Sequence, residues 1–170
     1  MNRSSPLLIG ITGGIGAGKS TAAKIFSTLG IPIYSADDRA KWLMANSKGL
    51  KSSIKAAFGD ESYLPDGSLN RTYLANVVFS DQEKTKTINE LVHPAVKNDF
   101  ESWSARQKSP YVLKEAALLF ETGSYKDLDK VINVFAPAQT RVRRIMSRDP
   151  QRTKEQISSI IERQLSDKKK

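Results

Sequence analysis

The chain has 170 residues, of which 39% are hydrophobic and 26% charged, with a formal net charge of +9 and no cysteine. This composition is typical of one globular domain and excludes a disordered chain, a disulfide framework and a thiolate metal site. No apolar run is long enough to cross a membrane, and Leu7–Ile11 is too short for a signal-peptide core, so we expect a cytoplasmic protein without a membrane partner.

The N-terminal segment predicts a strand, a helix and a second strand. The branched apolar run Leu7–Thr12 is typical of a buried strand, and helical spacing of apolar residues follows from about Lys19 until Gly30 ends it. Ile31–Tyr34 predicts the second strand. Because a helix connects the two strands through short loops, we expect both in one parallel sheet.

The middle of the chain predicts helices and then a return to strands. An apolar stripe at i, i+3, i+4 spacing runs from Ile88 to Trp103 and indicates the clearest helix. Shorter helical patterns precede it, and two apolar runs typical of buried strands follow it. The shorter helices are expected at Ala40–Leu43, Leu50–Phe58 and Leu69–Phe79, and the strands at Tyr111–Leu113 and Val131–Phe135.

The C-terminal segment predicts two helices, an arginine-bearing one after Pro137 that Asp149-Pro150 breaks, and another from about Ile157. The expected fold class is α/β: a parallel sheet flanked by helices, with a helical insertion and an arginine-rich lid. Within a single domain, we expect the core at about 1–38 and 109–136, the insertion at about 39–108, and the lid with its following helix at about 137–170.

The segment Gly13–Ser20 reads GGIGAGKS and matches the P-loop pattern G-x-x-x-x-G-K-[ST] without a mismatch. Glycines let backbone N–H groups approach a polyphosphate, and the helix that follows adds the positive end of its dipole. Lys19 is expected at the β- and γ-phosphates and Ser20 at Mg²⁺. We therefore expect ATP and Mg²⁺, with the nucleotide held by Gly14, Ile15, Gly16, Ala17, Gly18, Lys19, Ser20 and Thr21.

Other nucleotide-binding classes fit the sequence less well. A dinucleotide site would need glycine at position 19, where lysine stands, and a GTPase would need an N-K-x-D segment, which the chain lacks. A motor protein would place an acidic residue after an apolar strand, and Glu115 is only a weak candidate for that residue. The short chain, the helical insertion and the late arginines favour a small-molecule kinase with a closing lid.

The excess positive charge has three possible explanations: an anionic small molecule as ligand, a solvated basic face, or a nucleic acid as partner. It lies mainly in Arg141–Arg152 and Lys168–Lys170, without interleaved aromatic residues or zinc-finger spacing. We therefore expect an anionic small molecule as the partner rather than a nucleic acid, although a salt-dependent nucleic-acid binder is the alternative.

Five segments taken together resemble the dephospho-CoA kinase family: TGGIGAGKST, SADD, LVHP, ALLFE and RRIMSRD, in this order across essentially the whole chain. The resemblance implies a P-loop kinase-like fold with a helical substrate-binding insertion and a lid. It also implies ATP-dependent phosphorylation of the ribose 3′-hydroxyl of dephospho-CoA, with Mg²⁺. Family members usually continue beyond the Gln164 region into a further strand, which we expect this chain to lack.

The resemblance assigns roles in the acceptor site. Asp37, just after the second strand, matches the aspartate expected as the base for the acceptor hydroxyl, and a helix-capping aspartate is the alternative. Ser35 stands where many members have a further aspartate. His93, the only histidine, matches a substrate contact, with a structural hydrogen bond as the alternative.

The remaining expected site residues lie in the second half of the chain. Leu118, Leu119 and Glu121 match a wall of the substrate site, next to Ala117, where the family usually has proline. Arg144 and Arg148 are one helical turn apart and are expected to face the transferred phosphoryl group from the lid. The other arginines of this helix, Arg141 and Arg143, are expected on other faces.

Two further readings remain open from the sequence. One alternative is phosphorylation of another small metabolite or nucleotide, and the other is ATP binding with little turnover. The sequence gives no indication of the oligomeric state.

Overall fold

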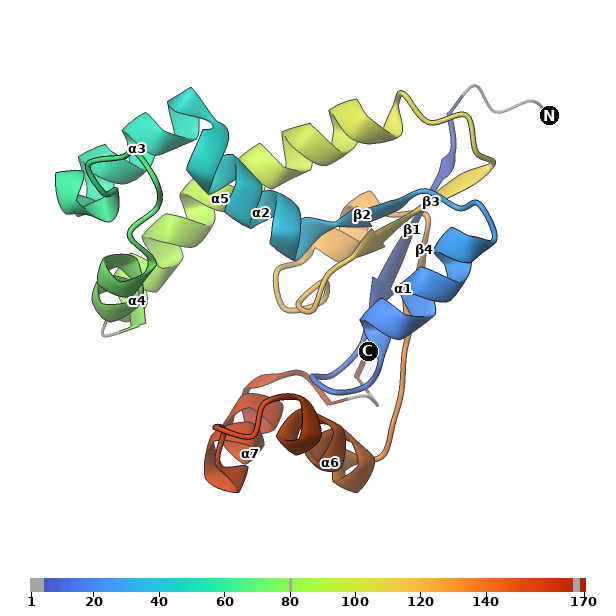
Figure 1. Cartoon of the computed structure of the whole chain (residues 1–170). Coiled ribbons are helices and arrows are strands. Elements are labelled where there is room, and N and C mark those ends of the chain that lie inside the picture. Colours follow the sequence, from blue (N-terminus) through green and yellow to red (C-terminus); the bar gives the residue numbers. More distant parts are fainter. Residues whose placement is uncertain (1–4, 80, 167–168) are drawn as a thin grey trace. The chain divides into compact units, whose positions relative to one another are not determined.

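Short parallel strands form the centre of the fold. The computed structural model describes residues 5–79, 81–166 and 169–170. Within these residues one sheet is found, and its strands lie in the order β2-β3-β1-β4 (Figure 1). The strands are β1 (Leu7–Thr12), β2 (Ile33–Ser35), β3 (Tyr111–Glu115) and β4 (Lys130–Asn133). The predicted parallel sheet is confirmed.

The register of the sheet brings the carboxyl ends of the strands to one edge. β3 lies between β1 and β2, so that Glu115 pairs with Ile11 on one side and with Ser35 on the other. On the far side of β1, Thr12 pairs with Asn133 of β4. In parallel sheets of this kind, ligands bind at this edge.

Helix α1 (Lys19–Thr28) covers one face of the sheet. Ala23 packs with Ile11 and Leu113 in a buried apolar cluster, and the partly buried Phe26 lies against it. The opposite face is covered near Gly10, where an added Cβ would lie 2.7 Å from a methyl carbon of both Leu119 and Leu128. The sheet is therefore buried on both faces, as parallel sheets require.

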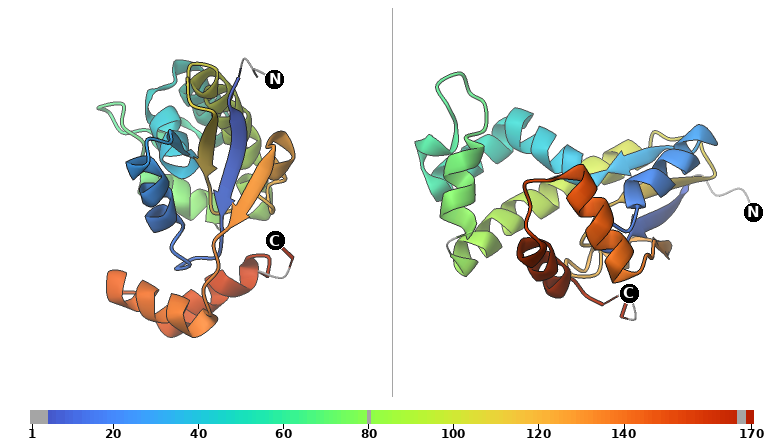
Figure 2. Two further views of the ribbon diagram at one scale, coloured as in Figure 1. Left: turned by 90° about the vertical axis from the view of Figure 1, so that its right-hand side faces the viewer. Right: turned by 60° about the horizontal axis from the view of Figure 1, so that its bottom comes forward.

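These strands and α1 belong to the first of two compact units, and the rest of that unit follows β3. A 3₁₀ turn (Ser124–Asp127) precedes β4, and helices α6 (Ala138–Arg148) and α7 (Lys154–Arg163) follow it and pack on each other (Figure 2). Ile145 and Ile157 supply their buried apolar side chains. α7 begins with a capping box. The N–H of Gln156 donates to the Thr153 hydroxyl, and the N–H of Thr153 donates to the Gln156 side chain.

The second unit, Ala36–Trp103, is helical. Its elements are α2 (Ala36–Asn46), α3 (Lys48–Phe58), a 3₁₀ turn (Asp60–Ser62), α4 (Arg71–Phe79) and α5 (Gln82–Ser104), whose last residue belongs to the first unit. α5 runs through Pro94 without a break. Buried apolar side chains from these elements form its core: Leu43, Leu50, Ile54, Phe58, Tyr63, Leu74, Val78, Val92, Val96 and Phe100.

Several element boundaries differ from those expected. The second strand begins two residues later, at Ile33, and the fourth ends at Asn133 rather than Phe135. α4 begins at Arg71 rather than Leu69, because Leu69 pairs with Tyr63 in an isolated bridge. The two residues lie six positions apart, on either side of the Pro65-Asp66-Gly67 turn, so the segment before α4 is part of this turn and not of the helix.

The described chain divides into two compact units, one built from the segments before Ala36 and after Trp103, the other from Ala36–Trp103. Across residues 5–79, 81–166 and 169–170, none of the helices combines the length and the apolar character needed to cross a membrane.

The central strand provides a test of the sheet core. Leu113 is fully buried between its neighbours on β3, so Leu113→Ala removes apolar contacts and leaves a cavity. We expect a loss of about 2–5 kcal/mol in the free energy of unfolding, measured by urea titration. Leu29→Ala, at a side chain 71% exposed, is the matched control and should cost less than about 0.5 kcal/mol. Equal losses in the two variants would contradict this assignment of the core.

Candidate functional site

The glycine loop lies between β1 and α1. β1 ends at the buried Thr12, and α1 begins at Lys19 after Gly18, the N-cap residue, whose φ is 104°. No side chain caps the first turn of this helix. The N–H groups of that turn therefore face the loop with the positive end of the helix dipole, an arrangement suited to anions.

The loop has a conformation that side chains would oppose. Gly13, Gly16 and Gly18 all have positive φ, which residues with a Cβ rarely adopt. The turn is closed by a hydrogen bond of 3.0 Å from the N–H of Ala17 to the carbonyl of Gly14. The strand–loop–helix context required of a P-loop is thus present.

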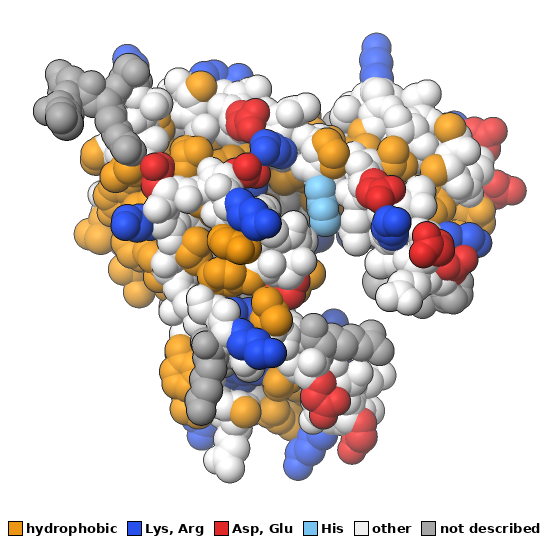
Figure 3. Space-filling model, turned by 180° about the vertical axis from the view of Figure 1, so that it is seen from behind, with side chains coloured by type: hydrophobic (Ala, Val, Ile, Leu, Met, Phe, Trp, Pro, Cys, Tyr) orange, Lys and Arg blue, Asp and Glu red, His pale blue; other side chains and the backbone are white. Residues whose placement is uncertain are grey.

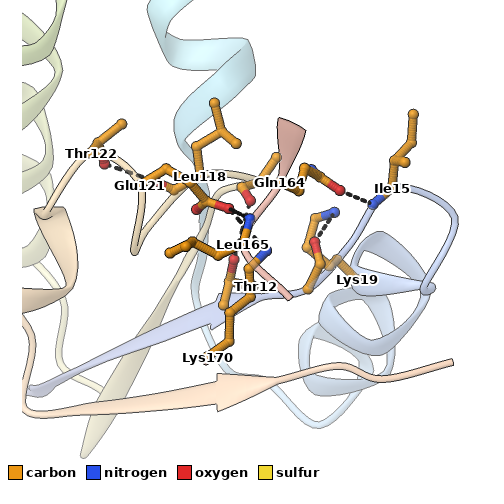
Figure 4. A network of polar contacts seen from close by, with 11 residues as sticks. Thr12, Ile15, Lys19, Leu118, Glu121, Thr122, Gln164, Leu165 and Lys170 are labelled. Atoms are coloured by element: carbon orange, nitrogen blue, oxygen red, sulfur yellow. Dashed lines mark hydrogen bonds and ion pairs between the residues drawn. The ribbon is translucent and has the colours of Figure 1, made fainter. Parts of the chain in front are cut away.

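The lysine and the hydroxyl residues of the motif follow directly. The Lys19 ammonium lies over the loop and donates a hydrogen bond of 3.0 Å to the carbonyl of Gly13 (Figure 4). Ser20 and Thr21 are exposed in the first turn of α1. The lysine ammonium and an exposed serine hydroxyl therefore stand at the same helix end.

Gln164, which follows α7, contacts the glycine loop, and no sequence pattern predicted this contact. Its Oε1 accepts a hydrogen bond of 2.9 Å from the backbone N–H of Ile15 (Figure 4). The two residues are 149 positions apart, and an isolated glutamine after a helix carries no local signal for such a contact. The Gln164 amide oxygen thus occupies the place at the Ile15 N–H where a P-loop would bind a phosphate oxygen.

The arginines of α6 divide into buried and exposed groups. Arg144 is exposed, but its Nη1 donates to the carbonyls of Gly16 and Ala17 at 3.4 and 3.1 Å. Arg148 is exposed. Arg141, expected on another face, is only 6% exposed. The i, i+3 spacing of Arg141 and Arg144 was the sequence signal that both could face the loop.

Glu115 lies at the carboxyl edge of the sheet. It is 9% exposed, ends β3, and pairs in register with Ile11, two residues before the glycine loop. From its sequence position, Glu115 was only a weak candidate for the acidic residue of a motor protein. The structure places its carboxyl group on the strand next to the loop, where an acidic side chain suits a metal–phosphate site.

The turn after β3 carries three of the expected substrate residues. Leu118 is 44% exposed, whereas Leu119 is fully buried and packs against Gly10. Glu121 is partly buried, and its Oε1 accepts a hydrogen bond of 3.0 Å from the N–H of Leu165 and lies 3.2 Å from the Nζ of Lys170 (Figure 4). Of the two leucines, only Leu118 is open to a ligand.

The electrostatics of Glu121 follow from these contacts. Burial acts to raise the pKa of its carboxyl group, but backbone N–H groups of Glu121 itself and of Leu165 and the Lys170 ammonium outweigh it. The pKa of Glu121 therefore lies below its ordinary value. The ionised form holds the N–H of Leu165 and the ammonium of Lys170, and Leu165 directly follows Gln164 at the glycine loop.

The helical unit contains two of the expected acceptor-site residues. Asp37 is exposed in the first turn of α2, and His93 is exposed on α5 directly before Pro94. Next to Asp37 along the helix, Arg39 makes a bidentate ion pair with Asp99, with N···O distances of 2.9 and 2.6 Å. This pair ties the start of α2 to α5.

A depression of about 740 Å³ runs along α5 in the helical unit. It is lined by the side chains of Gln82, Glu83, Thr85, Lys86, Asn89, Glu90, His93 and Pro94. On the face shown in Figure 3, Lys and Arg side chains are interspersed with Asp and Glu rather than gathered in one stripe.

Comparison with known proteins gives a consistent picture. A sequence model of the dephospho-CoA kinase family matches residues 7–170. A dephospho-CoA kinase of Porphyromonas gingivalis is 41% identical over 143 residues, covering 84% of this chain and 70% of the relative. A solved structure from Thermus thermophilus gives a TM-score of 0.85 at 33% identity, covering 97% of this chain and 83% of its own. A dephospho-CoA kinase from Campylobacter jejuni gives 0.64 at 28% identity, covering 91% and 78%.

The lowered pKa of Glu121 predicts a pH dependence of stability. Because the folded pKa lies below the unfolded value of about 4.3, the contribution of the carboxylate is present above that value and is lost as the pH falls through the folded pKa. Glu121→Gln should lower the free energy of unfolding by about 1–3 kcal/mol at pH 7. Urea titrations from pH 7 to pH 3 should show the two proteins converging in acid, and a constant difference would contradict the assignment.

Proposed function

The chain belongs to the dephospho-CoA kinase family, and we propose that it transfers the γ-phosphoryl group of ATP to the ribose 3′-hydroxyl of dephospho-CoA, giving coenzyme A and ADP. The observation that carries the proposal is the glycine loop, a complete P-loop between β1 and α1 in a chain that matches the family over residues 7–170. A cytoplasmic location, with no nucleic-acid or membrane partner, is part of the proposal.

The nucleotide is held by the loop and the first turn of α1. Backbone N–H groups of the loop bind phosphate oxygens, and Lys19 exchanges its bond with the Gly13 carbonyl for the β- and γ-phosphates. The N–H of Ile15 exchanges the Gln164 amide oxygen for a phosphate oxygen. The residues that would contact ATP are Gly14, Ile15, Gly16, Ala17, Gly18, Lys19, Ser20 and Thr21.

The residues at the loop fit a magnesium ion bound together with the phosphates. Ser20 offers an exposed hydroxyl as a ligand, and Glu115 offers an acidic side chain at the adjoining strand end. Among the residues that the structure describes, no group of three acidic or histidine side chains forms a metal cage, which suits an ion held mainly by substrate oxygens. When bound, Mg²⁺ neutralises charge on the β- and γ-phosphates.

Asp37 is the proposed base. Its exposed carboxylate accepts a hydrogen bond from the 3′-hydroxyl and orients that oxygen in line with the γ-phosphorus. As the new P–O bond forms and the bond to the β-phosphate oxygen breaks, the hydroxyl proton passes to Asp37 and ADP leaves. Ser35 cannot take this role, since a hydroxyl is not a base at neutral pH.

Four of the expected site residues have proposed roles toward the acceptor. We propose that Leu118 and Glu121 line its site, with the buried Leu119 supporting Leu118 from behind, and that His93 contacts it from α5. On α6, Arg144 releases the carbonyls of Gly16 and Ala17 and, with Arg148, offsets the charge that develops on the transferred phosphoryl group.

A coupled ADP-release assay with a panel of acceptors tests the reaction. We expect ADP release with dephospho-CoA to exceed that with other nucleotides and small metabolites, and Lys19→Ala to lower kcat/KM by about 10²–10³ while the melting temperature changes little. Preference for another acceptor would overturn the proposed substrate. ATP binding without turnover on any acceptor would make the chain a nucleotide-binding protein instead.

Asp37→Asn tests the base directly. The amide keeps the size of the side chain and can still cap a helix, but it cannot accept the hydroxyl proton, so kcat should fall about a hundredfold or more with both substrates still binding. The matched control is Asp38→Asn, which removes the same charge from an exposed neighbour paired with Lys41 and should keep most of kcat. If Asp37→Asn retains more than about a tenth of kcat, Asp37 is not the base.

A further inference from the structure

We propose that Arg141 is a positioning residue of the nucleotide site, whose guanidinium lies against the P-loop at Gly14 and supplies a fixed positive charge that strengthens binding of ADP and ATP alike. This inference rests on the proposed ATP site and adds a residue that lies outside the P-loop motif and differs from the two proposed lid arginines.

Burial distinguishes Arg141 from the other arginines of its helix. Arg141 is 6% exposed, whereas Arg143, Arg144 and Arg148 are all exposed. Arginine is almost never fully buried unless it is paired, and Arg141 is not without a polar partner in the structure. Arg141 lies in the first turn of α6, where its N–H donates to the carbonyl of Pro137 at 3.0 Å.

The glycine at position 14 is explained by this arginine and not by its backbone. Gly14 is an unspecified position of the P-loop pattern, and it is not among the glycines with positive φ. A Cβ at Gly14 would overlap the guanidinium of Arg141, with the Cζ only 2.7 Å away. A side chain at this position would therefore require the guanidinium to move.

The backbone of Arg141 also fits closely against the loop. A Cβ on Gly16 would lie 2.7 Å from the carbonyl oxygen of Arg141 and 3.0 Å from the Cγ1 of Ile145, one helical turn further along. α6 thus meets the loop along a single face, with Arg141 at one end of the contact and Ile145 at the other. The backbone from which the Arg141 side chain extends is therefore packed directly against the loop.

The position of this charge determines which step it affects. A unit charge a few ångströms from a polyphosphate, with little water between them, interacts far more strongly than one on the exposed surface. Because the guanidinium is fixed against the loop, it acts on the bound phosphates of ADP and ATP in the ground state. Arg144, which is exposed, has the freedom to act as charge develops during transfer.

Calorimetric titration of the full chain with ADP and with ATP tests the inference. Arg141→Gln should raise both Kd values about tenfold, the effect of losing one charge-assisted interaction, while kcat changes less. Arg141→Lys keeps the charge and the aliphatic stem and should stay within about threefold of the parent. Arg143→Gln, which removes an exposed charge from the same helix, should stay within about twofold.

Gly14→Ala provides an independent route to the same effect. Its new Cβ would overlap the guanidinium of Arg141, so it should displace that group and weaken ADP binding about as much as Arg141→Gln does. Because both changes remove one interaction, the double variant should be no weaker than either single variant. This test remains valid even if Arg141→Gln fails to fold.

Several outcomes would overturn the inference. These are unchanged Kd values in Arg141→Gln, equal weakening in Arg141→Lys and Arg141→Gln, equal weakening in Arg143→Gln, or full additivity with Gly14→Ala. A parent protein that binds neither ADP nor ATP would instead overturn the proposed function. Nucleotide binding without phosphorylation of dephospho-CoA would overturn the acceptor and leave the role of Arg141 measurable.

Discussion

The glycine loop must present bare backbone to a polyphosphate, and it therefore has almost no side chains with which to hold its own shape. That constraint explains why groups from distant parts of the chain converge on it. The carbonyl of Val134 lies against its first glycine, Ile145 lies behind Gly16, Arg144 donates to its carbonyls, and Gln164 accepts from one of its N–H groups. The rigidity that a phosphate cradle needs is supplied from outside the motif.

The parallel sheet places these groups within reach. Because every strand runs the same way, the residues that follow β1, β2, β3 and β4 all emerge at one edge. The P-loop follows β1, the proposed base follows β2, and the turn with Glu121 follows β3. α6, reached after β4, then returns its buried face to the loop. Strand direction, rather than any single side chain, gathers the nucleotide chemistry.

Glu121 links two parts of the site through the chain after α7. Its carboxylate holds the N–H of Leu165 and the ammonium of Lys170, and the preceding residue, Gln164, holds the loop at Ile15. A phosphate that takes the Ile15 N–H must release Gln164. In the proposed function, Glu121 therefore helps to place the residue that occupies the Ile15 N–H before the nucleotide binds.

The sequence by itself determined the class of fold, the phosphate loop and the family, because each depends on local patterns. Apolar runs, helical stripes and the eight-residue motif Gly13–Ser20 are read within a short window. Only the tertiary structure decided that Glu115 ends a strand beside the loop, that Gln164 meets Ile15 and that Arg141 is buried. These contacts join positions more than 100 residues apart, and the free energy that selects them comes from packing, which leaves no periodic trace in the sequence.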